Sequence, residues 1–327
     1  MSRFAKTAPG VPAPAHSQRR SSGRAGGVLG ALLLAAGAFG AGACEGSSRA
    51  PDAQARANAE SAEVSVRFDI GPSKDATVQV LAFRATVSAA LPEVGRPDVL
   101  GTVDPLAAAA PAQGCVARDV DLANRALLAR GASIELEELS GIGIGLGDGA
   151  TLLRPSPQLY PDVAAVVGGV VAQVGPQAVA TLPDRVSLYT ADSELPVAEL
   201  SVPAAPRLIA IGGAAPAQVT RVDTQEPLTL TVAGGAGGLV ELRPYGSTAA
   251  IACAIPTAAG AAEATVVIPR PLVAFVAAAS GHAGSAAEPG VRASLEVARR
   301  ARLLQTTGGG ARVSVEVRAT TTVELRP

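Results

Sequence analysis

The sequence predicts an all-β protein built from one or two antiparallel β-sandwich domains. Glycine and proline, 36 and 25 of the 327 residues, interrupt the chain about once every five positions, which leaves little room for long helices. Apolar residues alternate with polar ones over many short segments, the period that places one face of a strand against a core. Hydrophobic residues make up 48% of the chain, enough to build that core.

The first 43 residues have the features of an export leader. Residues 1–25 are polar and basic, and the 18 residues from Gly26 to Ala43 carry no charge. The apolar stretch ends in small residues immediately before Cys44. A basic start, an apolar stretch and a small-residue cleavage point are typical of a secretory signal peptide.

The Gly-Ala-Cys sequence that ends this leader resembles the lipobox of bacterial lipoproteins. The resemblance implies that the Cys44 thiol carries diacylglycerol, that the leader is removed before Cys44, and that the new amino group is acylated. Ala41 stands where the family usually has Leu. Each buried methylene adds ~0.8 kcal/mol, so two or three acyl chains anchor a protein stably. We therefore expect residence in the cell envelope, on the periplasmic or cell-surface side, with membrane lipid as a partner.

Two alternatives stay open for this segment. In the first, the leader ends in an ordinary secretory cleavage site, and Cys44 is an incidental cysteine. In the second, the apolar stretch remains as a signal anchor, since roughly 20 apolar residues span a bilayer.

Residues 44–62 are small and polar, as expected of a flexible tether. Val163–Val174 and Leu272–Ala279 are too short to cross a membrane and are predicted as buried strands.

The exported body is predicted to hold a β-rich domain at 63–205 and a β-sandwich domain at 206–327, divided near Pro203–Gly213. Alternation predicts strands in the first region at 64–70, 78–85, 134–136 and 142–146. Short strands with turn signals between them are typical of a sandwich. In the second region these pieces are 217–223, 228–233, 238–243, 249–255, 263–268, 293–304 and 311–325. Helix is expected mainly at Val116–Arg130, before Gly131, and 294–304 is ambiguous.

The body also resembles a group of predicted lipoproteins and secreted proteins of myxobacterial-type soil bacteria. The resemblance covers roughly residues 78–327 and depends on Cys115-Val116, on Gly131–Leu139, and on the apolar run around Cys253 followed by Gly260 and Val267-Ile268-Pro269. It implies an Ig-like β-sandwich tail and an envelope location, and it adds no chemistry. The group often has a Trp in a tail strand, where Thr231–Gly234 has none.

Cys115 and Cys253 would be an even pair in an oxidising compartment if Cys44 is lipidated. A disulfide between them would stabilise the fold by roughly 5 kcal/mol in the loop-closure model. The alternative is two buried free thiols, because Cys253 lies within an apolar run. The spacing and the shortage of histidine argue against a zinc site.

Catalytic side chains are scarce in the body. Its single histidine, His282, lies in a Gly/Ala/Ser segment without a nucleophile motif, and is expected to be an exposed loop residue. We therefore predict a non-enzymatic binding, adhesion or scaffold module with no catalytic residue, metal or cofactor. One alternative is an exported hydrolase that uses Ser or paired carboxylates, with His282 as its candidate imidazole. Another is a subunit of an envelope complex, marked by an exposed apolar sheet edge or patch.

Two further motifs are expected to be structural. The glycine-rich run Gly141–Gly149 lacks a following helix to bind phosphate, so we predict a strand whose glycine face admits another backbone. Glu135, Glu137 and Glu138 are expected on a solvated strand face rather than in a Ca²⁺ site. Tyr160 and Tyr189 are candidates for a contact surface or for core positions.

The chain after the leader has 22 bases and 28 acids, and this acidic balance disfavours nucleic acid as a partner.

Overall fold

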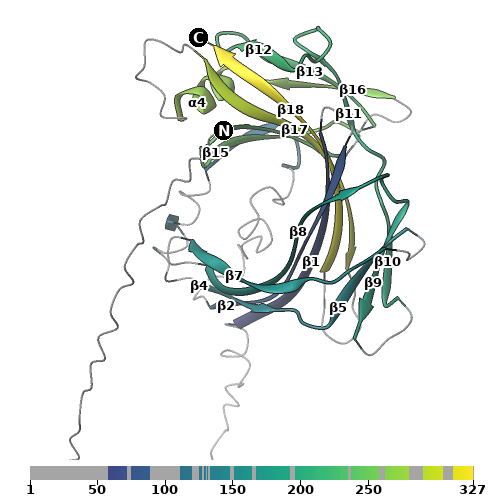
Figure 1. Ribbon diagram of the computed structural model, residues 1–327. Helices are drawn as coiled ribbons and strands as arrows, with labels where there is room; N and C mark the ends of the chain where they lie inside the picture. The colour runs from purple at the N-terminus through teal and green to yellow at the C-terminus, as the bar shows by residue number, and fades with distance from the viewer. Residues whose placement is uncertain are drawn as a thin grey trace, which may run out of the picture. The chain divides into compact units, whose positions relative to one another are not determined.

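The chain is all-β, as the sequence predicts. The computed structural model describes residues 58–71, 75–88, 111–119, 125–126, 129, 131, 133–147, 151–163, 167–191, 196–234, 237–257, 262–279, 290–304 and 312–326. These residues form three sheets and the ten-residue helix α4 (Arg270–Ala279), and residues 125, 126 and 129 are also helical (Figure 1). The predicted leader, Cys44, His282 and most of the predicted tether lie outside the described residues.

The largest sheet has eleven strands and takes them from both ends of the body. Its order is β3-β15-β14-β17-β18-β1-β2-β4-β8-β7, and β12 pairs with β18 beside this path. The bounds are β1 Asn58–Ile70, β2 Ala76–Ser88, β3 Cys115–Asp119, β4 Ser133–Glu138, β7 Ser156–Val163, β8 Val167–Val179, β12 Val219–Asp223, β14 Leu239–Pro244, β15 Ala249–Ala254, β17 Val291–Leu304 and β18 Arg312–Arg326. We call it the large sheet.

Two smaller sheets complete the fold. The four-stranded sheet has the order β10-β9-β5-β6, and the three-stranded sheet has the order β11-β13-β16. The four-stranded sheet comprises β5 Ile142–Leu146, β6 Thr151–Leu153, β9 Arg185–Thr190 and β10 Ala198–Ser201. The three-stranded sheet comprises β11 Arg207–Ile211, β13 Leu228–Ala233 and β16 Glu263–Ile268, and is followed by the helix α4, Arg270–Ala279.

The first core lies between the four-stranded sheet and the large sheet. Alternate residues of β1 and β18, among them Val64, Phe68 and Val315, are completely buried there against Ile144 and Val186. Burying each such side chain stabilises the fold by ~1.5–3 kcal/mol. The period of two that predicts these strands in the sequence is thus the period with which they enter the core.

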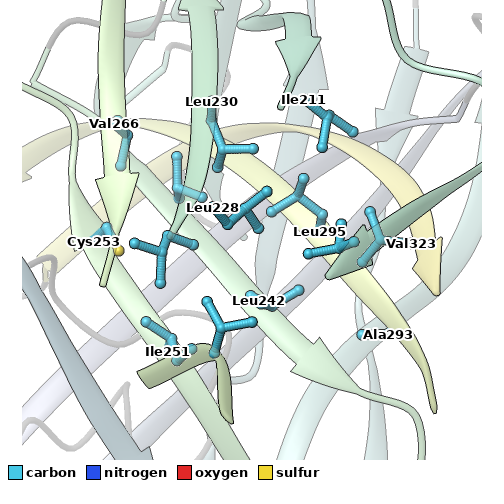
Figure 2. Packing of buried hydrophobic residues seen from close by; sticks show 14 of the residues in the cluster. Ile211, Leu228, Leu230, Leu242, Ile251, Cys253, Val266, Ala293, Leu295 and Val323 are labelled. Carbon is cyan, nitrogen blue, oxygen red and sulfur yellow. The ribbon is translucent and has the colours of Figure 1, made fainter. Parts of the chain in front are cut away.

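The second core lies between the three-stranded sheet and the other half of the large sheet. Figure 2 shows Leu228, Leu230 and Val266 pointing toward Leu242 and Leu295 of the large sheet. Helix α4 adds two further buried valines, at 273 and 276. A smaller apolar cluster around Phe83 and Leu136 packs separately where β2, β4 and β8 meet.

Strand β18 passes through both cores. Val313, Val315 and Val317 belong to the first core, and Val323 and Leu325 belong to the second. The boundary predicted at residues 205 and 206 falls between β10 and β11, so it separates the two smaller sheets. The large sheet nevertheless crosses this boundary, since β1 pairs with β18 and β3 pairs with β15.

The seven strands predicted between residues 217 and 325 are confirmed as β12 to β18, and the ambiguous 294–304 segment is a strand. One prediction is wrong, and a second is wrong in part. Leu272–Ala279 is helical, because Pro271 suits a first helical turn and residues 273 and 276 fall on one buried helix face. The predicted helix at 116–130 is wrong at its start, where residues 116–119 belong to strand β3 and pair with β15, but residues 125, 126 and 129 of the same segment are helical.

Candidate functional site

A cleft of about 770 Å³ opens between the residues of the two cores. Its floor is formed by Ala319–Thr321 of β18 and by Ile70 at the end of β1. Its walls are residues 205–208, which enter β11, and residues 216–218, which precede β12. We call it the junction cleft. Its volume lies within the range of roughly 300–1,000 Å³ that is typical of ligand sites, which also favour junctions between domains.

The sequence of β18 explains why the two cores do not merge. Its odd-numbered residues face the cores, and Ala319 and Thr321 occupy that face between Val317 and Val323. A small side chain and a polar one bury too little apolar surface to hold a covering sheet there. The two smaller sheets therefore cover β18 on either side of these residues, and the cleft lies between them.

The strand pairing is also interrupted at the cleft. On one edge of β18, the parallel pairing with β1 ends at Ile70 opposite Ala319. The pairing with β12 begins at Val219 opposite Thr322. Thr320 and Thr321 therefore have strand partners only on the β17 side. Successive residues of a strand direct their backbone groups to opposite edges, so one of the two threonines presents its N–H and C=O to the cleft.

The described lining of the cleft is apolar with a few polar groups. Ile70, Pro206, Leu208 and Pro216 supply apolar surface, and Gln218 and the two threonines supply hydrogen-bonding side chains. Arg207 is the one charged residue of this described lining. Such a site can hold a ligand by shape, by hydrogen bonds and by one positive charge.

A second cavity, of about 730 Å³, is lined mainly by the continuous segment 178–185 between β8 and β9. Backbone hydrogen bonds fix this segment, from Gly147 N–H to the Arg185 carbonyl and from Val202 N–H to the Asp184 carbonyl. Because it is the hollow beside one connecting loop, we regard the junction cleft as the better candidate site.

The face of the large sheet that points away from both cores carries a network of charged side chains. Arg318 is 2% exposed, donates a hydrogen bond to Glu316, and bonds Glu296 with 2.7 Å between Nη1 and Oε2. Arg300 donates to the other oxygen of Glu316. Buried charges are tolerated only when paired in this way, so the network is a structural feature of the sheet.

Glu241 is the least satisfied member of this network. Its Oε1 accepts hydrogen bonds from Arg243, at 3.0 Å from Nε and 2.6 Å from Nη2, while its buried Oε2 has no hydrogen-bond partner. Glu296 lies directly opposite on β17. Burial raises the pKa of Glu241, the positive charges of Arg243 and Arg318 oppose that rise, and Glu296 adds to it.

We expect Glu241→Gln to reduce the loss of stability that accompanies rising pH. As the pH rises, a carboxyl group whose pKa is higher in the folded state loses its proton in the unfolded protein before it does so in the folded protein. The free energy of unfolding therefore falls as the pH rises from about 4.5 through the folded-state pKa, by about 1.4 kcal/mol for each unit by which that pKa is raised. Urea unfolding between pH 4 and pH 8 measures this slope. Replacement of the exposed Glu135 by Gln is the matched control, and an unchanged slope in Glu241→Gln would contradict the assignment.

Cys115 and Cys253 are joined by a disulfide bond. Cys253 is completely buried in the second core and Cys115 packs against that core from the edge strand β3. The bond links residues 138 positions apart. Of the alternatives left open by the sequence, the structure therefore has the bridged pair. Cys44, the predicted lipid attachment site, and His282 lie outside the described residues.

The other motifs occupy structural positions. Glu135, Glu137 and Glu138 are exposed on β4, as expected of a solvated face. The glycine-rich run forms strand β5, but side chains rather than another backbone cover its glycines. Tyr189 lies over Gly145 and Leu152 over Gly143. Tyr160 packs against the apolar cluster around Phe83.

The described residues contain neither a metal-binding cluster nor a membrane-spanning helix. No three His, Cys, Asp or Glu side chains within the described ranges are grouped so that they could hold a metal ion. In the same ranges, no helix is both long and apolar enough to cross a membrane.

Sequence reasoning did not single out the junction cleft, although two signals for it are present. The valine alternation of the last strand is interrupted by Ala-Thr-Thr-Thr at 319–322, and the predicted boundary segment contains Pro206 and Leu208. Neither signal shows that the two segments meet. That contact depends on pairing between strands far apart in the sequence.

Comparison with known proteins does not assign the chain to a family. No family model matches the chain, and no curated protein matches it. Among solved structures, the Fcho1 Mu homology domain of Danio rerio with bound Eps15 peptide is 8% identical, with a TM-score of 0.19. That comparison covers 81% of this chain and 97% of the other. A TM-score this low identifies no common fold.

Proposed function

We propose that the protein is a cell-envelope lipoprotein, anchored by acyl chains on Cys44, whose β-sandwich body is a non-enzymatic binding, adhesion or scaffold module. The observation that carries the anchor is the basic and apolar leader that ends in Gly-Ala-Cys44. Two or three acyl chains hold a protein at a membrane without a spanning helix. The polar residues after Cys44 would then connect the anchor to the first strand.

The junction cleft supports the binding role. It is a concave site with apolar surface, a few polar groups and a single positive charge in its described lining. These are properties of a recognition site. The buried charges of the large sheet are engaged in ion pairs with one another, so they support the sheet rather than a reaction.

Labelling with a radioactive fatty acid in a bacterial host tests the anchor. The wild-type protein is expected to incorporate the label, and Cys44→Ser is expected to lose it completely because the acceptor thiol is gone. Ser47→Ala, three residues further along the tether, is the matched control and should remain labelled. Label in Cys44→Ser, or an unlabelled wild-type protein, would overturn the proposed lipidation.

One observation favours the second candidate, a subunit of an envelope complex. Leu159 is 81% exposed on β7, the last strand of the large sheet, and Leu152 is 46% exposed on β6, an edge strand of the four-stranded sheet. Pro157 lies on β7, and prolines on edge strands hinder the addition of another strand. A partner would therefore contact the leucine side chains rather than extend the sheet.

A further inference from the structure

The junction cleft has features that match an extended peptide. At the interruption between β1 and β12, the edge of β18 presents the backbone N–H and C=O of one threonine. A peptide backbone offers the complementary C=O and N–H for this one residue, as in the main-chain hydrogen bonds of strand addition, while β1 and β12 occupy the edge on either side. The apolar surface of Ile70 and Leu208 beside this edge suits the alternating side chains of such a peptide.

The charge of the lining indicates one further property of the ligand. Arg207 is exposed at the start of β11, and the described lining of the cleft contains no carboxylate. An arginine pairs with a carboxylate through two parallel hydrogen bonds, which gives both affinity and orientation. An acidic side chain or a free C-terminus would satisfy Arg207, whereas a basic ligand would be repelled.

Other ligand classes fit the cleft less well. Carbohydrate sites and single-stranded nucleic-acid sites depend on exposed aromatic rings, and the described lining has no aromatic residue. A wholly apolar ligand would leave the open backbone groups and Arg207 without partners, which costs free energy when they are covered.

We propose that the junction cleft binds a short extended peptide segment of a partner protein, with apolar side chains against Ile70 and Leu208 and a carboxylate on Arg207. The proposal deepens the binding role proposed above, on which it rests. It does not depend on the lipid anchor, because the cleft lies entirely within the described body.

The test is selection from a synthetic library of hexapeptides by the purified full-length protein in detergent. Each peptide has Val, Ile, Leu, Pro or Thr at its first five positions. The sixth residue is Glu, and both its side-chain carboxylate and the C-terminal carboxylate are free. Enriched peptides are identified by mass spectrometry, and their dissociation constants are measured by fluorescence anisotropy. We expect a family of related sequences to be enriched, and we expect the amidated Gln counterparts to bind about tenfold more weakly.

Two pairs of variants locate the binding site. Ala217→Trp places a large side chain on the exposed wall of the cleft and is expected to abolish enrichment, whereas Ala215→Trp, exposed but outside the lining, is not. Arg207→Gln is expected to remove the tenfold preference for the carboxylate, and the exposed Arg302→Gln is expected to retain it. Unchanged thermal unfolding shows that the variants remain folded.

The outcomes separate this proposal from the proposed anchor. No enrichment by the wild-type protein, or equal enrichment by Ala217→Trp, overturns the peptide site and leaves the fatty-acid labelling result untouched. Equal binding of the carboxylate and amide peptides overturns the role of Arg207. Conversely, an unlabelled Cys44 together with cleft-dependent enrichment overturns the anchor and retains the peptide site.

Discussion

Replacing both Cys115 and Cys253 by alanine is expected to lower the free energy of unfolding by about 5 kcal/mol, because the disulfide closes a very long loop in the unfolded chain. The two cysteines are 138 positions apart. The loop-closure entropy removed from the unfolded state increases with the number of residues enclosed. A loss of this size is a large fraction of the 5–15 kcal/mol that is roughly typical for a folded protein.

Urea denaturation of the two proteins measures the difference. A reducing agent provides an independent check, since it should destabilise the wild-type protein to a similar extent and leave the double alanine variant unchanged. Alanine is preferred to serine because Cys253 is completely buried, and a buried hydroxyl without a partner would add its own cost. Equal stability of the wild-type and variant proteins would show that the bond does not constrain the unfolded chain as inferred.

Gly169→Ala is expected to destabilise the protein by about 3–5 kcal/mol, through backbone strain and a collision with a neighbouring strand. Gly169 has a φ of +127°, a conformation that residues with a side chain rarely adopt. A Cβ at this position would lie 2.0 Å from the carbonyl oxygen of Leu136. Because Gly169 pairs with Leu136 of β4 and with Tyr160 of β7, neither neighbouring backbone can move away without losing strand pairing.

Gly175→Ala is the matched control for this prediction. Gly175 lies on the same strand, β8, but a Cβ there would meet no atom within 4 Å, and its φ is not in the positive range. We expect this variant to unfold at nearly the same urea concentration as the wild type, or at a slightly higher one, since alanine restricts the unfolded chain. A similar loss of stability in both variants would exclude the proposed collision.

The strands of the second half were predictable because their signals are local. The pieces from β12 to β18 have apolar alternation or, in β15, a short continuous apolar run, and no distant segment has to be known to recognise them. Helix α4 was missed for the opposite reason. Its run of Val and Ala fits a buried strand or a short helix equally well, and only Pro271 in the first turn indicates a helix.

The features that depend on pairing between distant strands could not be predicted. Arg318 contacts Glu296 because β17 and β18 are neighbours in the sheet, and the sequence of neither strand alone determines the register of their pairing. The junction cleft likewise joins residues near 70, 207, 217 and 320. The covering of Gly145 by Tyr189 is of the same kind, since β5 and β9 are separated by three other strands in the sequence.

Mass spectrometry of the mature N-terminus, on protein purified from membranes of a bacterial host, tests the proposed function most directly. We predict a chain that begins at residue 44, with a mass increased by diacylglycerol on the sulfur and by an acyl group on the amino nitrogen. A chain that retains residues 1–43, or one whose first residue is an unmodified cysteine, would contradict it.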